Sequence, residues 1–488
     1  GVEVLLFDMD QSLSEEGVKS ALKIKPNAFF IPENADLITP CNYTDHLEKI
    51  KDCDWVLEVI AEKIEWKIEL YNKISNYISS DAIITSNTSG LLLKDLTEHM
   101  DSKLASKFFI THFFNPPRYM KLVEVITSDK TDSMNVAPVV EFLEKNLGKG
   151  VVKANDTPNF IANRIGVYGM MVVMNETVKH KLSIEDVDAL TGTLIGRPKS
   201  ATYRTADVVG LDTLTFVANT AYENCPNDDE RDIFIIPKYL KVMLENNWLG
   251  QKNGQGFYKK IDKGVIHSID IETLEYTKQA KKKYDGIKLA KEHIDPIKSF
   301  NALIYSDDQA GKFIWDTTKR VLCYCSKRLG EISDSIISID NAMKWGFAWS
   351  KGPFEIWDDI GLIRSLEKMK KDKVRYPDWL DKMVDSGCNT FYRVRNGNRQ
   401  YYCMKAQTYI NVDVQPSITT FFDFKLSNKL IKKNWSASLY DLGDGVAGVE
   451  LHSILKADLN PIDGSIMETI QFSLDWVEEN KFKGLVIS

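Results

Sequence analysis

Short apolar runs alternate with amphipathic helical stretches from residue 1 to about residue 157. This rhythm is typical of a parallel sheet whose strands are joined by crossover helices. The apolar runs predict strands at residues 2–7, 55–60, 82–85, 108–111 and 122–126. The sequence Asp156-Thr157-Pro158 then predicts a helix start, with Thr157 as its cap and Pro158 at the first helical position, where the missing N–H costs nothing.

The helix that follows is apolar almost all round between residues 165 and 174. Such a helix is buried on several sides, as at a dimer interface or a domain centre. Membrane insertion is the less favoured reading, because polar Asn163, Arg164 and Asn175 flank the stretch closely. No apolar run of the chain reaches the roughly 18 to 20 residues that a membrane span requires.

Two short patterns recur about 150 residues apart, which predicts a duplicated helical domain rather than a solenoid. Residues 184–188 (Ile-Glu-Asp-Val-Asp) resemble residues 336–340, and residues 207–211 (Asp-Val-Val-Gly-Leu) resemble residues 358–362. A Lys-rich polar stretch near residues 262–296 is expected to link the copies. The pattern changes again from about residue 436, where residues 442–451 predict a turn and an alternating strand.

Composition and charge exclude several classes of protein. The 488 residues carry a net charge of −7 with both signs mixed along the chain, so no basic stripe is present and no nucleic-acid partner is expected. The seven cysteines form no CxxC pair, which predicts neither a metal site nor a disulfide framework and favours a reducing, cytoplasmic location. The N-terminus lacks the pattern of a signal peptide.

Both ends of the sequence read as interior strands. The chain opens with Gly1 and runs directly into an apolar strand, and it stops after the apolar residues 484–488. A buried strand needs neighbours on both edges. The sequence is therefore expected to be a fragment of a longer protein.

Polar residues follow three of the predicted strands, where ligands of open parallel sheets bind. Asp8 ends the first strand, at the place where a dinucleotide fold keeps the carboxylate that binds ribose hydroxyls. The glycine-rich phosphate loop that should precede it by about 20 residues is absent, because the sequence starts too late. The segment 86–90 (Ser-Asn-Thr-Ser-Gly) and the segment 112–117 (His-Phe-Phe-Asn-Pro-Pro) follow two successive strands.

His112 alone is best explained as a satisfied core histidine, but Glu124 changes the balance. Glu124 shares a strand face with apolar Leu122 and Ile126, where a carboxylate is costly unless it is paired. A nearby imidazole is the obvious partner. Such a pair fixes the tautomer of the histidine and suits it to take a proton from an alcohol.

With these motifs in order, the chain resembles the 3-hydroxyacyl-CoA dehydrogenases over about residues 1–260. The specific motifs are His-Phe-Phe-Asn-Pro from His112 and Met-Lys-Leu-Val-Glu ending at Glu124, with Asp-Thr-Pro from Asp156 and Phe-Ile-Ala-Asn-Arg ending at Arg164. Residues 297–365 resemble a second copy of the helical domain of that family. The tail from about residue 436 is similar to the opening of an enoyl-CoA hydratase of the crotonase fold.

The resemblance implies an α/β Rossmann-type NAD-binding domain, N-terminally truncated, over residues 1–157. Two all-α domains of the dehydrogenase C-terminal type follow at 158–262 and, with the linker, at 263–435. Residues 436–488 begin a crotonase-fold domain. The implied reaction is NAD-dependent oxidation of (S)-3-hydroxyacyl-CoA to 3-oxoacyl-CoA in fatty-acid β-oxidation, within a bifunctional dehydrogenase and hydratase.

The resemblance also assigns roles and partners. His112 is the general base, Glu124 its orienting partner, and Ser89 and Asn163 contact the 3-oxygen of the substrate and the surroundings of the histidine. The positions expected to contact NAD are Asp8, Val59, Glu62, Lys67 and Asn87. An acyl-CoA substrate, a homodimer through the helical domains and a thiolase partner are implied. Asp8 favours NAD over NADP because a carboxylate repels a 2′-phosphate.

Two departures from the family pattern bear on acyl-chain preference. Asn159 stands where Gly is frequent, and the run of residues 197–200 (Arg-Pro-Lys-Ser) stands where Gly-Pro-Phe-Glu is frequent, although the second copy keeps that run at residues 352–355. Without the phosphate loop the chain is expected to bind NAD poorly, and without the hydratase site it is not expected to hydrate an enoyl-CoA. The alternatives are a non-catalytic relative and a short-chain 3-hydroxybutyryl-CoA dehydrogenase of another pathway.

Overall fold

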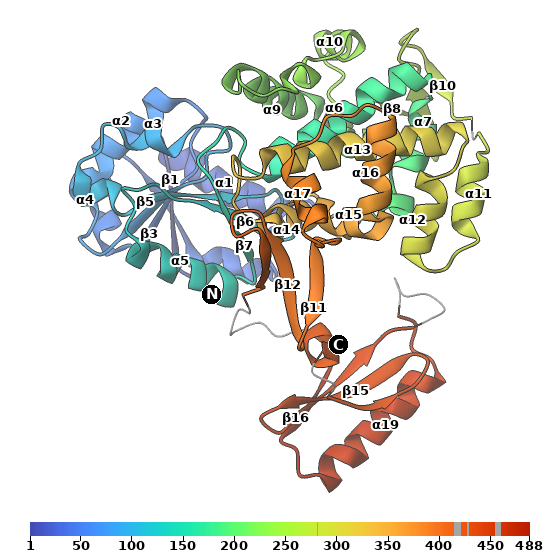
Figure 1. The fold of residues 1–488 in the computed structure, drawn as a ribbon. Coiled ribbons are helices and arrows are strands. Elements are labelled where there is room, and N and C mark those ends of the chain that lie inside the picture. The colour runs from blue at the N-terminus through green and yellow to red at the C-terminus, as the bar shows by residue number, and fades with distance from the viewer. Residues whose placement is uncertain (281, 414–420, 427–428, 454–459) are drawn as a thin grey trace. The chain divides into compact units, whose positions relative to one another are not determined.

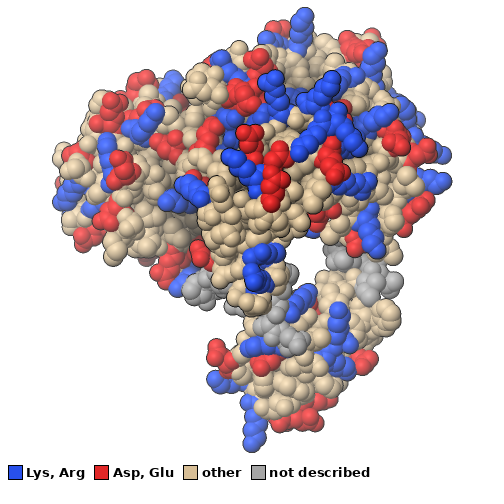
Figure 2. Space-filling view, in the orientation of Figure 1, with Lys and Arg blue, Asp and Glu red and all other residues tan. Residues whose placement is uncertain are grey.

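The computed structural model describes residues 1–280, 282–413, 421–426, 429–453 and 460–488 (Figure 1). The chain divides into two compact units, Gly1–Phe391 and Tyr392–Ser488. Acidic and basic side chains are interspersed over the face shown in Figure 2.

The first part of unit 1 is built on two sheets. Strands β1 (Val4–Asp8) and β2 (Ile38–Asn42) pair in parallel. The larger sheet has the order β3-β4-β5-β6-β7, and its strands are β3 (Trp55–Glu58), β4 (Ile83–Ser86), β5 (Phe108–Phe113), β6 (Leu122–Ile126) and β7 (Gly150–Ala154). The five predicted strands are confirmed to within two residues at each end, and β2 and β7 were missed.

The prediction of an all-parallel sheet is wrong at one place, because β5 and β6 run antiparallel. Only residues 114–121 join these strands. A parallel crossover needs a dozen or more residues, so a link this short brings the chain straight back beside β5. This hairpin-like return carries the candidate site.

Helices cover the sheets: α1 (Gln11–Lys23), α2 (Ile64–Ile74), α3 (Leu93–Thr97), α4 (Ser102–Ala105) and α5 (Ser133–Lys145). Helix α5 places Val139 and Leu143 against Phe109, Val123 and Val125, which are all buried. One face of the sheet is thereby closed, so the polar groups at the strand ends are held on a rigid base.

The long helix α6 (Ala162–His180) starts four residues later than the sequence predicted. Asn159 and Phe160 have positive φ angles of 63° and 48°, which no right-handed helix contains. The carboxylate of Asp156 instead accepts hydrogen bonds from the backbone N–H groups of Leu93 and Lys94, at the start of α3.

The predicted burial of residues 165–174 is confirmed within this one chain. Helix α6 packs against α9 (Leu211–Asn224), α13 (Gln309–Arg328) and α14 (Ile336–Gly346). Figure 1 shows α6 and α13 side by side. The homodimer stays a prediction, since the apolar surface of α6 is covered without a second copy. Among the residues described, no helix has both the length and the apolar character needed to cross a membrane.

The internal repeat has a structural counterpart. Asp188, in α7 (Ile184–Leu190), accepts hydrogen bonds from the backbone N–H groups of Tyr203 and Arg204 at the start of α8 (Tyr203–Val209). In the second copy Asp340 accepts from Phe354 and Glu355 at the start of α15 (Pro353–Ile360), which α16 (Leu362–Lys371) follows. The two segments are therefore equivalent.

This equivalence corrects one alignment. The run 197–200 was expected at the position of residues 352–355, but the hydrogen bonds to Asp188 place residues 201–204 there. Tyr203 lies fifteen residues after Asp188, whereas Phe354 lies fourteen residues after Asp340. Each copy has a loop before this helix, at residues 196–202 in the first copy and 347–352 in the second, and Arg197 lies in the first of these loops.

The remaining elements of unit 1 are α10 (Lys238–Glu245), β8 (Tyr258–Asp262), β9 (Val265–Ile269), β10 (Tyr276–Lys278), α11 (Asp285–Lys291), α12 (Pro296–Ile304) and α17 (Trp379–Asp385). The stretch expected as a linker thus contains two strands and a helix. Strand β9 pairs with β8 and β10 pairs with β9, and at the start of β8 the backbone N–H groups of Phe257 and Tyr258 donate to Asp207.

Unit 2 has two sheets. One contains β11 (Tyr392–Arg395), β12 (Asn398–Cys403) and β13 (Thr408–Asn411). The other contains β14 (Leu430–Lys433), β15 (Ala437–Gly443), β16 (Val446–Leu451) and β17 (Gly484–Ile487), with α18 (Phe421–Leu426) and α19 (Gly464–Glu479). The predicted turn and strand within 442–451 are confirmed, since Asp444 and Gly445 connect β15 to β16 with positive φ angles.

Candidate active site

His112 and Glu124 face each other across the antiparallel pair of β5 and β6. Nδ1 of His112 lies 2.7 Å from Oε2 of Glu124, and the two residues are 5% and 0% exposed. Residues directly opposite in such a pair have neighbouring side chains on the same face. The register therefore produces the contact that the sequence could only predict.

The second oxygen of Glu124 is held by the start of α6. Oε1 accepts hydrogen bonds from the backbone N–H groups of Ile161, at 3.1 Å, and Ala162, at 2.8 Å. Backbone N–H groups at a helix N-terminus favour the ionised form of a carboxylate. An ionised Glu124 can only accept, so the proton of a neutral His112 belongs on Nδ1.

That tautomer leaves a lone pair on Nε2 of His112. Within the described part of the chain no hydrogen-bond partner contacts this nitrogen. The rings of Phe114 and Phe160 lie beside the imidazole, with centroids 4.7 and 5.5 Å away. His112 thus offers an unoccupied base in an apolar surrounding.

Asn87 ties the loop after β4 to the strand that carries His112. Its Oδ1 accepts a hydrogen bond of 2.8 Å from the backbone N–H of Phe113. Asn163 is the second residue of α6, directly after the turn that binds Glu124, and its partly buried amide has no hydrogen-bond partner among the described residues. Asn87 and Asn163 are therefore both held close to the strand and the helix start that position His112 and Glu124.

Glu62 organises the segment that contains Ser89. Oε1 of Glu62 accepts from the hydroxyl of Thr88 at 2.6 Å and from the N–H groups of Ser89 and Gly90 at 2.9 Å each. Burial raises the pKa of Glu62, but these hydrogen bonds and the charge of Lys67 outweigh it and leave the pKa below its usual value. Glu62 thus fixes the shape of this loop.

Glu58 is a buried carboxylate that sequence reasoning missed. Its two oxygens accept hydrogen bonds from the N–H of Ile60 at 2.7 Å, Nζ of Lys67 at 2.7 Å, the hydroxyl of Tyr71 at 2.7 Å and the hydroxyl of Ser86 at 2.6 Å. The bond from Ile60 turns the chain, so β3 ends at Glu58 and not at residue 60. The argument applied to Glu124, a carboxylate within an apolar strand, would have found Glu58 as well.

The remaining predicted cofactor positions lie at the end of β1, directly after β3 and in α2. Asp8 ends β1 with an exposed carboxylate that accepts only from the N–H of Met9, at 2.7 Å, in the described structure. Val59 follows β3 with its side chain 64% exposed. Lys67, in contrast, is 1% exposed and binds Glu58, with Glu62 at 3.6 Å.

Comparisons of the sequence with known proteins identify one family. The model of the 3-hydroxyacyl-CoA dehydrogenase NAD-binding domain matches residues 1–157, and that of the C-terminal domain matches residues 160–260. A probable 3-hydroxyacyl-CoA dehydrogenase of Bacillus subtilis is 43% identical over 475 residues, which are 97% of this chain and 59% of the relative. One of Deinococcus radiodurans is 45% identical and covers 53% of this chain and 76% of the relative.

Two further comparisons concern more distant proteins. A putative fatty acid oxidation complex trifunctional enzyme of Rickettsia felis is 36% identical over 68% of this chain and 45% of its own length. The chain thus spans about half of the longer relatives. The crystal structure of 3-hydroxybutyryl-CoA dehydrogenase from Escherichia coli K12 has a TM-score of 0.57 at 19% identity, covering 79% of this chain and 94% of that chain, which indicates a shared fold.

Proposed function

This chain belongs to the 3-hydroxyacyl-CoA dehydrogenase family of NAD-dependent oxidoreductases, and from that premise we propose that it oxidises the 3-hydroxyl group of a 3-hydroxyacyl-CoA to a ketone. The observation that carries the proposal is the buried His112–Glu124 pair with Nε2 of His112 unoccupied. A non-catalytic relative would have no need to keep a buried base open in this way.

His112 acts as the general base. Nε2 takes the proton of the 3-hydroxyl group while C3 loses a hydride, and the C3–O bond becomes a carbonyl. NAD supplies the hydride acceptor. Glu124 stabilises the imidazolium that forms, because it holds the Nδ1 proton and is itself held by the N–H groups of Ile161 and Ala162.

Asn163 and Ser89 position the substrate. The amide of Asn163 is free to donate to the 3-oxygen, and it sits on the same helix start that fixes Glu124. The hydroxyl of Ser89 lies 3.4 Å from Oε1 of Glu62, a long contact that it can exchange for one to substrate. The start of α6 thus orients both the substrate, through Asn163, and the base, through Glu124.

The residues present fit NAD at the end of β1. Oδ2 of Asp8 accepts no hydrogen bond from any described residue, so it is available to the ribose hydroxyl groups. Val59, Glu62, Lys67 and Asn87 complete the proposed cofactor contacts. Lys67 acts there through Glu62 and the loop of Ser89, since its ammonium group is already paired with Glu58.

The proposed pathway is fatty-acid β-oxidation, within a protein that also carries a hydratase of the crotonase fold. The relative of Rickettsia felis, named a fatty acid oxidation complex trifunctional enzyme, supports this setting. The sheet β14–β17 with α19 is the proposed start of the hydratase part. An acyl-CoA substrate follows from the family, and a thiolase partner is part of the same proposal.

The test is the oxidation of NADH with acetoacetyl-CoA, followed at 340 nm, with the chain as given and with a strand and glycine-rich loop added before Gly1. Activity in either form supports the dehydrogenase. No activity in both forms, with NAD bound, would favour a non-catalytic relative. Substrates of four to sixteen carbons then separate a β-oxidation enzyme from a short-chain 3-hydroxybutyryl-CoA dehydrogenase.

A further inference from the structure

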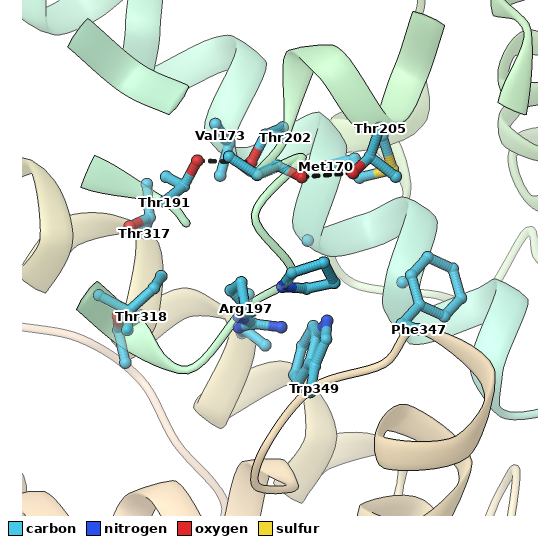
Figure 3. A pocket seen from close by; sticks show the side chains of 16 residues that line it. Met170, Val173, Thr191, Arg197, Thr202, Thr205, Thr317, Thr318, Phe347 and Trp349 are labelled. Carbon is cyan, nitrogen blue, oxygen red and sulfur yellow. Dashed lines mark hydrogen bonds between the residues drawn. The ribbon is translucent and has the colours of Figure 1, made fainter. Parts of the chain in front are cut away.

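A cavity of about 70 Å³ lies between the two helical copies, beside α6 and α13. Gly166, Met170 and Val173 line it from α6, and Thr318 and Val321 line it from α13. The loop of Arg197 and the segment after α14, with Phe347 and Trp349, close the remaining sides (Figure 3). One water molecule needs about 10 to 15 Å³ of such a cavity, so the cavity has room for about five groups of the size of water.

Among the described residues, Arg197 is the only charged one that lines this cavity. Its guanidinium lies over the ring of Trp349, and no carboxylate of the described chain pairs with it. Loss of hydration lowers the pKa of Arg197 below its usual value. A partly buried cation without a counter-ion is costly, and an anion is the ligand that removes the cost.

The threonine hydroxyl groups around the cavity differ in whether they make a hydrogen bond within the protein. Thr191, Thr205 and Thr317 each donate to a backbone carbonyl, and Thr202 donates to Thr191. The hydroxyl of Thr318 has no partner in the described part of the chain, and Thr318 and Arg197 both line the cavity (Figure 3). One cation and one free hydroxyl therefore face a space that is otherwise mostly apolar.

We propose that this cavity binds an aliphatic carboxylate, with Arg197 as its counter-ion and Thr318 as a second donor. A planar guanidinium matches the two oxygens of a carboxylate. A phosphate dianion fits less well, since a single cation faces the space and the lining includes Met170, Val173 and Phe347. The volume admits the carboxylate and the first carbons of its chain.

Two sources of this carboxylate are compatible with the position of the cavity. Asn163, Gly166, Met170 and Val173 follow one stripe of α6 at spacings of three and four residues, so the cavity continues the face that carries Asn163. The ligand is either a free short-chain acid or the far end of an acyl chain that ends in a carboxylate. The second source rests on the proposed function.

Binding is tested with hexanoate, using its neutral analogue hexanamide as the matched ligand. Titration calorimetry should detect hexanoate and not hexanamide. Arg197→Gln should weaken hexanoate binding by about ten- to a hundredfold, the worth of a charged hydrogen bond. Lys199→Gln, which neutralises an exposed lysine outside the cavity in the same loop, should leave binding unchanged.

A structural role for Arg197 would give a different result. Removing an uncompensated charge should leave the melting temperature of unliganded Arg197→Gln equal or higher, and Arg197→Lys should retain hexanoate binding within about tenfold. Equal binding of hexanoate and hexanamide, or hexanoate binding by Arg197→Gln at the wild-type level, would overturn the proposal. These measurements need no enzymatic activity, so they stand whether or not the dehydrogenase assignment holds.

The source is decided with 3-hydroxyacyl-CoA substrates of equal length that end in a methyl or a carboxylate group. If the site takes the chain end, Arg197→Gln lowers kcat/KM for the carboxylate-ended substrate by about tenfold or more and spares the methyl-ended one. If the site takes a free acid, the ratio of the two stays unchanged while hexanoate binding is lost.

Discussion

Glu58 and Glu124 are two glutamates of the same sheet with nearly the same burial. The partners of Glu58 are fully used in binding it, whereas the partner of Glu124 keeps an atom free for a reaction. Glu58 is 3% exposed and accepts from three side chains and one backbone N–H, so its site is closed. Glu124 is 0% exposed and accepts from two backbone N–H groups and one imidazole. The partner of Glu124 keeps one nitrogen unoccupied, whereas the hydroxyl and ammonium partners of Glu58 are tied to it.

This difference separates a buried carboxylate with a structural role from one that can support catalysis. A satisfied carboxylate stabilises a fold, as Glu58 does for the ends of β3 and β4. A carboxylate whose partner has an unused atom facing an accessible space can orient a reaction. The following predictions are ordered from the largest expected effect to the smallest.

The largest effect is expected from His112→Gln, which removes the base and keeps an amide of similar size. Turnover of acetoacetyl-CoA should fall by about a thousandfold or more. The affinity for NAD, measured by fluorescence titration, should change little because His112 lies apart from Asp8 and Val59. Strong residual turnover would exclude His112 as the base.

Glu124→Gln keeps the shape of the pair and removes its charge. The rate should fall by about a hundredfold, because the imidazolium loses its counter-ion. The measurement is the rate of NADH oxidation with acetoacetyl-CoA at a fixed pH, and a rate equal to that of the wild type would contradict the orienting role of Glu124.

Glu58→Gln tests the closed site. It leaves Lys67 buried beside a neutral amide, which should lower the free energy of unfolding by about 3 kcal/mol in urea denaturation. The rate at saturating NAD, per folded molecule, should change less than it does in Glu124→Gln. A loss of rate as large as that of Glu124→Gln with intact stability would erase the distinction between the two sites.

Asp207 is a third buried carboxylate, which accepts hydrogen bonds from the backbone N–H groups of Phe257 and Tyr258 and contacts no cation among the described residues. Burial raises its pKa to about 6, although these bonds lower it. The folded state therefore holds a proton that the unfolded state has already lost between about pH 4 and pH 6. Across this range, rising pH should destabilise the wild type by about 1 to 2 kcal/mol relative to Asp207→Asn.

Urea denaturation at pH 4.5, 6 and 7.5 measures this difference. Above about pH 6 the difference should become constant, since Asp207 is then ionised in both states. A difference that does not depend on pH would show that the carboxyl group of Asp207 does not titrate in this range.

Tyr71→Phe removes one of the four donors to Glu58 and keeps the aromatic ring. The expected loss is about 1 kcal/mol in the free energy of unfolding, with kcat unchanged. Because burial and the charge of Glu58 raise the pKa of Tyr71, the hydroxyl stays protonated and the loss should not vary between pH 6 and pH 9. A variation in that range would mean that Tyr71 ionises.

Much of the site could be predicted from the sequence because its members violate local patterns. His112 and Glu124 lie on apolar strands, where unpaired polar groups are costly, so the sequence predicted that they pair with each other. Glu58 carries the same signal between Leu57 and Val59. The repeat was predicted from two short motifs, and the structure adds that their aspartates make the same hydrogen bonds.

What could not be predicted depends on contacts between distant residues. The late start of α6 follows from the positive φ angles of Asn159 and Phe160. Asn often adopts such angles, so Asn159 carried a signal, whereas Phe160 did not. The antiparallel return of β6 could have been predicted, because the predicted strands 108–111 and 122–126 leave ten residues for the link, fewer than a parallel crossover needs. The expectation of a longer protein stays a prediction.

The protonation of His112 tests the central claim most directly. With ¹⁵N-labelled histidine, the His112 signals can be assigned among those of the seven histidines by their loss in His112→Gln. At a pH where His112 is neutral, the account predicts a protonated Nδ1 and a bare lone pair on Nε2. A proton on Nε2, with Nδ1 bare towards Glu124, would contradict it.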